Sequence, residues 1–309
     1  MGTRLRLVLD EAESSLYAEL PRATLALCRL ALQEYPRCIR AYVLMAAALW
    51  LLGDAASAAR SLRVILQVDP EHLVARYLLG LVLEDDDLDQ AIAELSIAFS
   101  QSPGDAEISQ ALQRLYKARD RSVPTLRPGR DALARWYAKG GLWGRALAEA
   151  ADLVVSRPER LDLRLLLVEA EWRTGQIDQA AALCQDLLLN YPNCLKANLI
   201  LGDIWQSQGK VEAAQALFQR ARDLDPENRL AMQLFTAAGR PLPFVADEPV
   251  VGLEVAEDGE ALRAMESVAE SLPEGLPLLE AAEHETRTGD STSTALTATA
   301  TDEHPGGTR

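Results

Sequence analysis

Apolar residues recur through the first 240 residues with the spacing of amphipathic helices, and they do so in short paired stripes. The stretch 195–228 shows the pattern best. Its first stripe holds Leu201, Ile204 and Trp205, and a second stripe follows the turn at Gly209. Neither helix could bury its stripe alone, so the pattern predicts pairs of short helices that stack on neighbouring pairs.

The same unit returns every 34 residues. Three residue types keep this step over three consecutive copies: Gly141, Gly175 and Gly209; Ala146, Ala180 and Ala214; Pro158, Pro192 and Pro226. Further upstream, Gly53, Ala58 and Pro70 take the same three places. The glycine suits a chain reversal that needs positive φ, and the proline ends the second helix of the pair. The first 240 residues therefore form one helix pair, repeated.

This unit resembles the tetratricopeptide repeat (TPR) family. The copy that matches the family motif best carries Leu201, Gly202, Trp205, Gly209, Ala214, Phe218, Ala221 and Pro226. The resemblance implies a solenoid in which the motif residues serve packing. Two copies depart from the motif. The copy at 73–104 has three aspartates, Asp85 to Asp87, in place of the turn glycine, and the copy at 5–38 is the weakest, as expected of a terminal repeat.

We therefore predict an all-α fold, an α-α superhelix of about six TPR-like helix pairs in two blocks. The pairs are predicted at roughly 3–34, 37–67, 71–101, 128–156, 159–190 and 193–223, with single capping helices near 104–118 and 227–237. Prolines and a glycine break the pattern at 119–129. The expected domains are a first block (1–118), a linker (119–126), a second block (127–240) and a tail (241–309).

The chain's charge is concentrated in the tail. Of the net charge of −15, residues 241–309 carry −12 and residues 1–240 carry −3. The end of the tail has low sequence complexity, which predicts a largely disordered acidic segment, although Leu262, Met265 and Leu272 could form a weak amphipathic helix. Two interpretations stay open. The tail keeps the protein soluble, or it docks on the repeats at the basic stretch 114–145 and competes with an acidic partner.

No residue arrangement typical of an enzyme is present. The three histidines are scattered, and neither a Ser-His-Asp arrangement nor a phosphate-binding loop can be found. No cofactor and no metal site are predicted. No apolar run approaches the length of a membrane span, and the N-terminus lacks the pattern of a signal peptide, so we expect a cytoplasmic protein.

Four cysteines form two pairs with matching surroundings, Cys28 with Cys38 and Cys184 with Cys194. In each pair one cysteine lies in a second helix and the other begins the next first helix. Small buried core positions are the simplest interpretation. A redox-sensitive pair is the alternative, although a reducing cytoplasm disfavours a stable disulfide. The ten-residue spacing does not suit zinc.

The resemblance also implies a binding surface. In the TPR family, positions 2, 5, 9, 12 and 13 of the first helices line a concave groove. The groove residues predicted here are Trp50, Tyr77, Leu81, Arg135, Lys139, Leu165, Glu169, Trp172, Arg173, Leu199 and Asp203. Some family members hold a peptide's C-terminal carboxylate with lysine and asparagine residues. Position 5 is never lysine in this chain, so that mode of binding is not expected.

We predict a non-enzymatic protein-interaction scaffold whose concave groove binds a peptide or helix of a partner protein. A few buried aromatic or arginine contacts would supply the affinity. The alternative is association with nucleic acid, because the stretch 114–145 holds nine basic and two acidic residues interleaved with aromatic ones. The acidity of the whole chain counts against it, and no membrane partner is expected.

Overall fold

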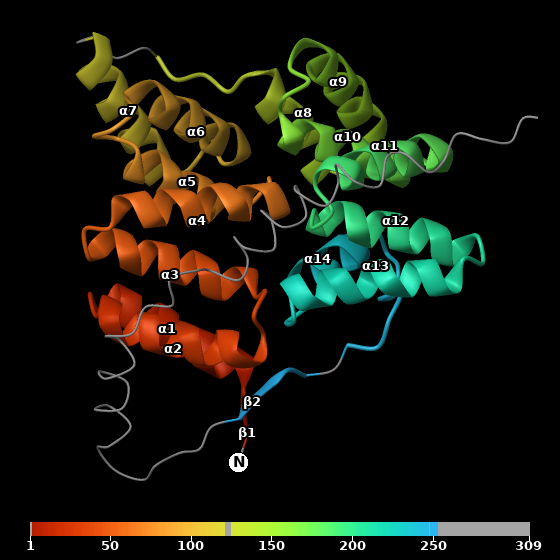
Figure 1. Ribbon diagram of the computed structural model, residues 1–309. Helices are drawn as coiled ribbons and strands as arrows, with labels where there is room; N and C mark the ends of the chain where they lie inside the picture. Colours follow the sequence, from red (N-terminus) through yellow and green to blue (C-terminus); the bar gives the residue numbers. More distant parts are fainter. Residues whose placement is uncertain (1, 121–124, 247, 253–309) are drawn as a thin grey trace, which may run out of the picture. The chain divides into compact units, whose positions relative to one another are not determined.

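A computed structural model describes residues 2–120, 125–246 and 248–252 of the 309-residue chain. Within these residues the chain forms fourteen α-helices and two short β-strands (Figure 1). The helices pack in consecutive pairs, which confirms the predicted all-α solenoid. Six pairs are present in the described chain, and a single helix follows the third pair and another follows the sixth.

The first half of the chain contains seven helices. Their bounds are α1 (Leu5–Tyr17), α2 (Pro21–Glu34), α3 (Ile39–Leu51), α4 (Ala55–Val68), α5 (Leu73–Val82), α6 (Leu88–Gln101) and α7 (Ala106–Asp120). Each helix packs on the next, and the first helices of neighbouring pairs also touch, α1 on α3 and α3 on α5.

The second half follows the same plan. Its helices are α8 (Arg130–Lys139), α9 (Trp143–Ser156), α10 (Leu161–Thr174), α11 (Ile177–Asn190), α12 (Leu195–Ser207), α13 (Val211–Leu224) and α14 (Arg229–Ala237). Helix α8 packs on α9 and α10, and it also contacts α6 of the first half.

The turn glycines do what the repeat predicts. Gly175 has φ of +82° and directly ends α10, and Gly209 has φ of +78° between α12 and α13. The aspartate turn of the third pair works without positive φ. The N–H groups of Asp86 and Asp87 donate to the carbonyl of Leu83, and the Asp87 side chain accepts from the backbone N–H of Gln90, capping α6. Helix α5 is correspondingly short.

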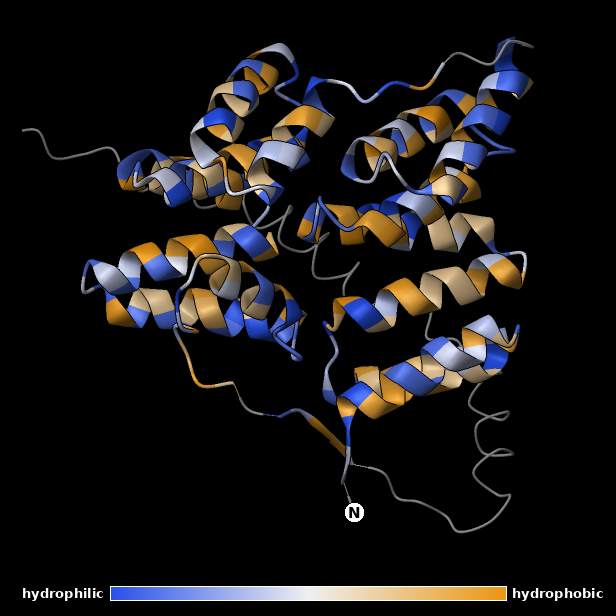
Figure 2. Ribbon diagram, turned by 180° about the vertical axis from the view of Figure 1, so that it is seen from behind, coloured by the Kyte–Doolittle hydropathy of each residue, from blue (hydrophilic) through white to orange (hydrophobic). Residues whose placement is uncertain are grey.

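Hydrophobic and hydrophilic positions alternate along the helices (Figure 2), and the buried positions are mainly apolar. Helix α3 is the most enclosed, since almost every residue from Ile39 to Leu49 is buried. Packing between α12 and α13 depends on Gly202, because a Cβ atom there would lie 2.5 Å from the ring of Phe218. The small residue thus permits the close approach of the two helices.

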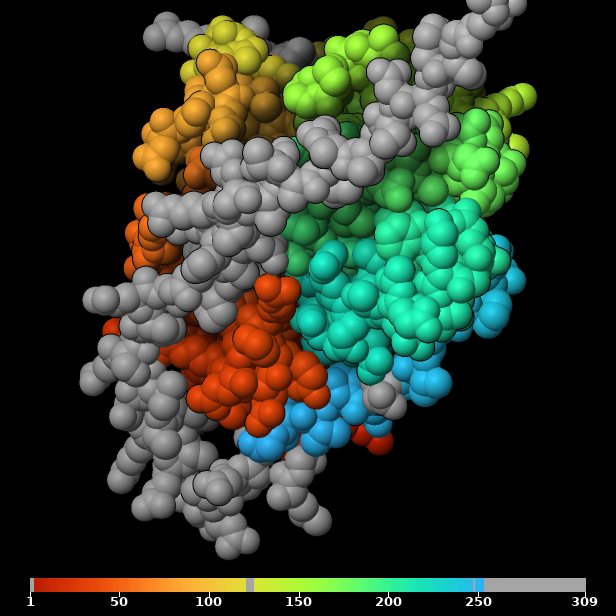
Figure 3. Space-filling model, turned by 45° about the vertical axis from the view of Figure 1, so that its right-hand side comes forward, coloured from red at the N-terminus to blue at the C-terminus, as the bar shows by residue number. Residues whose placement is uncertain are grey.

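The sequence did not predict the two strands. Strand β1 (Gly2–Arg4) precedes α1, in place of the first residues of a helix expected from residue 3, and pairs antiparallel with β2 (Val250–Gly252). The Tyr35 hydroxyl accepts from the N–H of Val250 at 3.0 Å and donates to its carbonyl at 3.2 Å. The end of the described chain therefore lies against the N-terminal helices (Figure 3).

Several predictions concern residues outside this description. The acidic segment from residue 253 onward, including the helix expected near 258–272, lies beyond the described residues, and so does part of the expected linker, 121–124. Within the described residues no helix is long and apolar enough to cross a membrane.

Candidate functional site

Two turns of identical sequence type bring charged side chains across the solenoid. Asp69-Pro70-Glu71 follows α4, and Asp225-Pro226-Glu227 follows α13. In each, the proline prevents the helix from continuing. The chain turns there toward the next first helix, so both glutamates lie at turns rather than on helices. We call these two segments the DPE turns.

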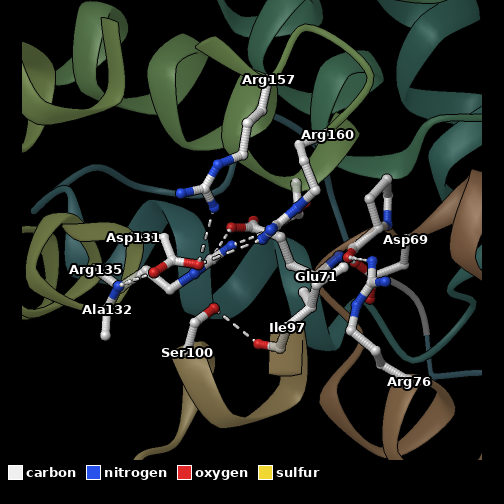
Figure 4. Close-up of polar contacts among 12 residues, drawn as sticks. Asp69, Glu71, Arg76, Ile97, Ser100, Asp131, Ala132, Arg135, Arg157 and Arg160 are labelled. Carbon is white, nitrogen blue, oxygen red and sulfur yellow. Dashed lines mark hydrogen bonds and ion pairs between the residues drawn. The ribbon is translucent and has the colours of Figure 1, made fainter. Parts of the chain in front are cut away.

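The first DPE turn reaches the second half of the chain. Glu71 Oε1 lies 2.9 Å from the guanidinium of Arg135 on α8, and its other oxygen pairs with the ammonium of Lys196 on α12. Arg135 also pairs with Asp162 at 2.6 Å, and Arg160 binds the same carboxylate at 2.8 Å. Figure 4 shows Glu71, Arg135 and Arg160 converging from separate elements.

This cluster is buried, yet its groups are held in their charged forms. Burial alone would lower the pKa of Lys196, but the carboxylates of Glu169 and Glu71 outweigh it and raise that pKa. Burial would raise the pKa of Asp162, but Arg160 and Arg135 lower it overall. Lys196 and Arg173 likewise lower the pKa of Glu169 against the effect of burial. Such an arrangement suits binding and orientation rather than proton transfer near neutral pH.

A second set of contacts joins α10 and α12 to α14. The Trp172 indole donates to Asp203 at 2.9 Å, and its ring meets Phe235 edge-on with centroids 5.8 Å apart. Arg173 donates to the Leu234 carbonyl at 3.0 Å. The guanidinium of Arg240 lies 5.2 Å from the Trp172 ring centroid and pairs with Asp203. Helix α14 and the residues after it therefore occupy these predicted groove positions.

The predicted groove residues thus have two different environments. In the second half, Arg135, Glu169, Trp172, Arg173 and Asp203 belong to the contacts above. Leu165 and Leu199 are buried, and Lys139 is exposed, although its ammonium donates to the Gln101 carbonyl at 3.2 Å. In the first half, Trp50, Tyr77 and Leu81 are only half-buried. The predicted groove residues of the first half remain partly accessible, whereas most of those in the second half contact the chain itself.

A small cavity of about 200 Å³ lies where the two DPE turns meet α3, α12 and α14. Its lining includes Cys38, Asp69, His72, Asp225 and Glu227. Burial raises the pKa of Asp69, and it raises the pKa of Asp225 to about 6. A larger open hollow of about 630 Å³ lies over α13 beside the segment 243–245.

Four arginines of the basic stretch 114–145 pair with carboxylates of the same chain. Arg114 pairs with Glu84 at 2.6 Å, and Arg119 pairs with Asp120 at 2.8 Å. Arg130 pairs with Glu149 and Asp152 on α9. Arg135 pairs with Glu71 and Asp162, as described above, and the guanidinium of Arg145 lies over the ring of Tyr137.

All four cysteines are free and buried. Burial raises the pKa of the Cys38 and Cys194 thiols to about 12, and it raises those of Cys28 and Cys184 as well. Few thiolates form at neutral pH under these conditions, so the four groups behave as small apolar core residues. No cluster of three or more metal-binding side chains occurs in the described parts of the chain.

Comparison with known families agrees with the repeat. A tetratricopeptide repeat model matches residues 132–193 and again 165–229. Residues 132–229 form tetratricopeptide repeats. No curated protein matches the sequence. The matched region covers the pairs α8–α9, α10–α11 and α12–α13, in which the glycine, alanine and proline positions keep their 34-residue step.

Solved structures of TPR proteins are also similar to the chain. The TPR domain of P58(IPK) is 11% identical over 76% of this chain, with a TM-score of 0.32, and this chain spans 64% of its length. YrrB, described as a TPR protein with an unusual peptide-binding site, is 16% identical over 67% of this chain and 96% of its own, with a TM-score of 0.29. The TPR2AB domain of yeast Sti1 in complex with pHSP90 is 17% identical over 76% of this chain and 98% of its own, with a TM-score of 0.34.

The sequence interpretation missed the residues that join the two halves of the chain. Glu71, Lys196, Arg40 and Glu227 were not among the predicted site residues. The repeated Asp-Pro-Glu sequence was the available signal, since a charged residue directly after a helix-ending proline lies at a turn facing the next first helix.

Proposed function

We propose that this protein is an interaction scaffold that binds a peptide or helix of a partner protein in the concave groove. Its TPR fold belongs to a class of protein-interaction modules, and YrrB and Sti1, to which it is similar, are described with a peptide-binding site and a bound partner. We further propose that the first half provides the primary binding surface, formed around Trp50, Tyr77 and Leu81.

One observation carries this choice. Trp50, Tyr77 and Leu81 stay partly exposed, while the corresponding positions of the second half are held by Glu71, α14 and Arg240. Half-buried aromatic side chains have a fixed orientation and still offer contact area, which is the usual character of the residues that dominate binding energy. The Tyr77 hydroxyl adds a polar group. Its partial burial, together with the nearby carboxylate of Glu107, raises its pKa.

The test is affinity capture with the full chain as bait. A Trp50→Ala, Tyr77→Ala variant should lose specific partners that the wild-type chain retains. The matched control is Trp136→Ala, because Trp136 is an exposed tryptophan (48%) on α8 outside the predicted groove. If the groove variant and the wild type capture the same partners, the groove assignment is wrong.

The geometry does not favour the nucleic-acid alternative. A stripe that follows a phosphate backbone needs cations free to release counterions. Arg114, Arg119, Arg130 and Arg135 instead pair with carboxylates of the same chain. A salt-dependent gel shift of nucleic acid by the full chain would support the nucleic-acid hypothesis again. The cytoplasmic location stays part of the proposal, and four free cysteines are compatible with a reducing compartment.

A further inference from the structure

Two five-helix units, one in each half of the chain, are related by a fixed offset. A shift of 156 residues carries α2, α3 and α4 onto α11, α12 and α13 with identical bounds. The same shift carries Cys28 onto Cys184 and Cys38 onto Cys194, and it carries the first DPE turn onto the second. The unit α1–α5 therefore reappears as α10–α14.

The residues that form ion pairs between the halves are related by the same offset of 156. Lys196 is held between Glu169 on its own half, at 2.7 Å, and Glu71 of the other half. Its counterpart Arg40 pairs with Glu13 on its own half at 2.7 Å and with Glu227 of the other half at 3.3 Å, and it also pairs with Asp10 at 2.6 Å, which has no counterpart because position 166 is leucine. Adding 156 carries Glu13 and Arg40 onto Glu169 and Lys196, and it carries Glu71, which pairs with Lys196, onto Glu227, which pairs with Arg40.

The cavity between the halves shows the same relation. Ile39 and Asp69 of the first half line it together with their counterparts Leu195 and Asp225. The correspondence is not complete, because Arg135, the second cation on Glu71, has no equivalent, and Glu227 meets Arg229 instead.

A contact set that is unchanged when its two sides are exchanged defines an isologous interface, the kind found in twofold dimers. In such an interface the same patch appears on both sides. The patch on the first half, with Glu13, Arg40 and Glu71, is therefore complementary to any second-half patch, whichever chain carries it. Only residues 121–129 connect α7 to α8, so the same contacts can form within one chain or between two.

We propose that the partner which fits this surface is a second copy of the chain, and that two chains can exchange halves to form a dimer. The first half of each chain then packs on the second half of the other. The exchange preserves both ion-pair sets and the contacts of β1 with β2. This inference does not depend on the proposed scaffold function.

Within a single chain the two halves are tethered, which gives an effective concentration of roughly millimolar order and favours the closed monomer at ordinary concentrations. Exchange should therefore appear when the contact within the chain is weakened while the contact between chains is kept. Charge reversal achieves this.

The experiment uses two full-length variants. One carries Glu71→Lys and Glu227→Lys, and the other carries Arg40→Glu and Lys196→Glu. In either variant alone, like charges oppose each other across the interface, within a chain and between identical chains. In an exchanged heterodimer the two Arg40–Glu227 contacts and the two Lys196–Glu71 contacts all join opposite charges, and the one like-charge contact left between these groups is that of Glu71→Lys with Arg135. An equimolar mixture should therefore double its mass from the 33.7 kDa of one chain, measured by native mass spectrometry, while each variant alone stays monomeric.

The matched control places all four substitutions in one chain. It restores opposite charges at the Arg40–Glu227 and Lys196–Glu71 contacts within the chain, so it should stay monomeric. Its helical circular dichroism shows whether the reversed charges beside Asp10, Glu13, Arg135 and Glu169 are tolerated. A mixture that stays at single-chain mass while all variants are folded would overturn the proposal. Equal dimerisation of each variant alone would also overturn it, because the ion pairs would then not determine which chains associate.

If the Arg40→Glu, Lys196→Glu chain fails to fold, wild-type chains with two different affinity tags give a second measurement. They are mixed in urea below the loss of helical circular dichroism and then returned to buffer. Co-capture that requires the urea step supports exchange. No co-capture, or co-capture without the urea step, contradicts it.

Discussion

The sharpest test of the interface between the halves is Glu71→Gln. The substitution keeps the size of the side chain and removes its charge. Glu71 is 18% exposed, and its partners Arg135 and Lys196 are 8% and 11% exposed, so little water can replace the lost carboxylate. The glutamine can still accept one hydrogen bond, but its amide NH₂ must face the other cation.

The size of the effect follows from what remains. Removing one member of a buried ion pair costs about 3–5 kcal/mol when the other charge is left alone. Here Arg135 keeps Asp162 at 2.6 Å, and Lys196 keeps Glu169 at 2.7 Å. Each cation therefore keeps one carboxylate partner. We expect the free energy of unfolding to fall by about 2–3 kcal/mol, which is less than the loss for an isolated buried pair.

The assay is denaturant unfolding followed by circular dichroism. The control is Glu84→Gln, which breaks the ion pair with Arg114, whose side chain is 56% exposed. An exposed pair contributes about 0–1 kcal/mol, and added salt should weaken it further while leaving the Glu71 effect largely intact. Equal losses in the two variants would refute the view that Glu71 is a buried anchor between the halves.

Three further predictions test the packing, the buried acids and the strand pair. Gly202→Ala places a Cβ 2.5 Å from an aromatic ring of α13 and should cost about 1–3 kcal/mol, whereas Gly144→Ala, with no atom within 4 Å of its Cβ, should be neutral or slightly stabilising in the same unfolding assay. Burial raises the pKa of Asp225 from its ordinary value of 3.8 to about 6, so the stability that the protonated form contributes should be lost as pH rises from about 4 through 6. Asp225→Asn should therefore gain roughly 1–3 kcal/mol relative to wild type between pH 4 and pH 7. An unchanged difference would contradict the raised pKa. Tyr35→Phe removes both hydrogen bonds to β2 and should speed amide exchange in β2 but not in α3; equal protection in wild type and variant would show that the strands hold without Tyr35.

The helix pairs were predictable because their determinants are local. Glycine at positions such as Gly175 and Gly209 permits the positive φ of the turn, and a proline such as Pro226 ends the second helix, so boundaries follow from a few residues close in sequence. The strands escaped prediction because each is three residues long and stable only beside the other. The residues that pair, Thr3 with Val251, lie at opposite ends of the described chain.

The site was predicted only in part, for a related reason. The repeat register predicts which side chains of the first helices face a concave groove, and it selected Arg135, Glu169 and Trp172. The register does not predict which residues these side chains contact, because Glu71 lies 64 residues from Arg135 and 125 from Lys196 along the chain. Contacts of that separation depend on how one half of the solenoid faces the other. Only the repetition of the DPE turn indicated such a pairing.

The chemistry of the interface bears on how readily the halves separate. The contacts that the shift of 156 residues relates to one another are ion pairs, together with a cavity whose lining includes the carboxylates of Asp69 and Asp225. Burying charges has a large desolvation cost that the pairing only offsets, so charges released by opening regain their hydration. Apolar side chains that become exposed on opening gain no comparable hydration free energy. Separation of the halves should therefore be less costly than the short distances suggest, and it would expose Lys196 and Arg135 on the concave side of the second half. In the closed monomer, Glu71 of the same chain supplies the carboxylate that pairs with Lys196 and Arg135. In the exchanged dimer, Glu71 of the other chain supplies it. In an open chain, an acidic ligand would supply it.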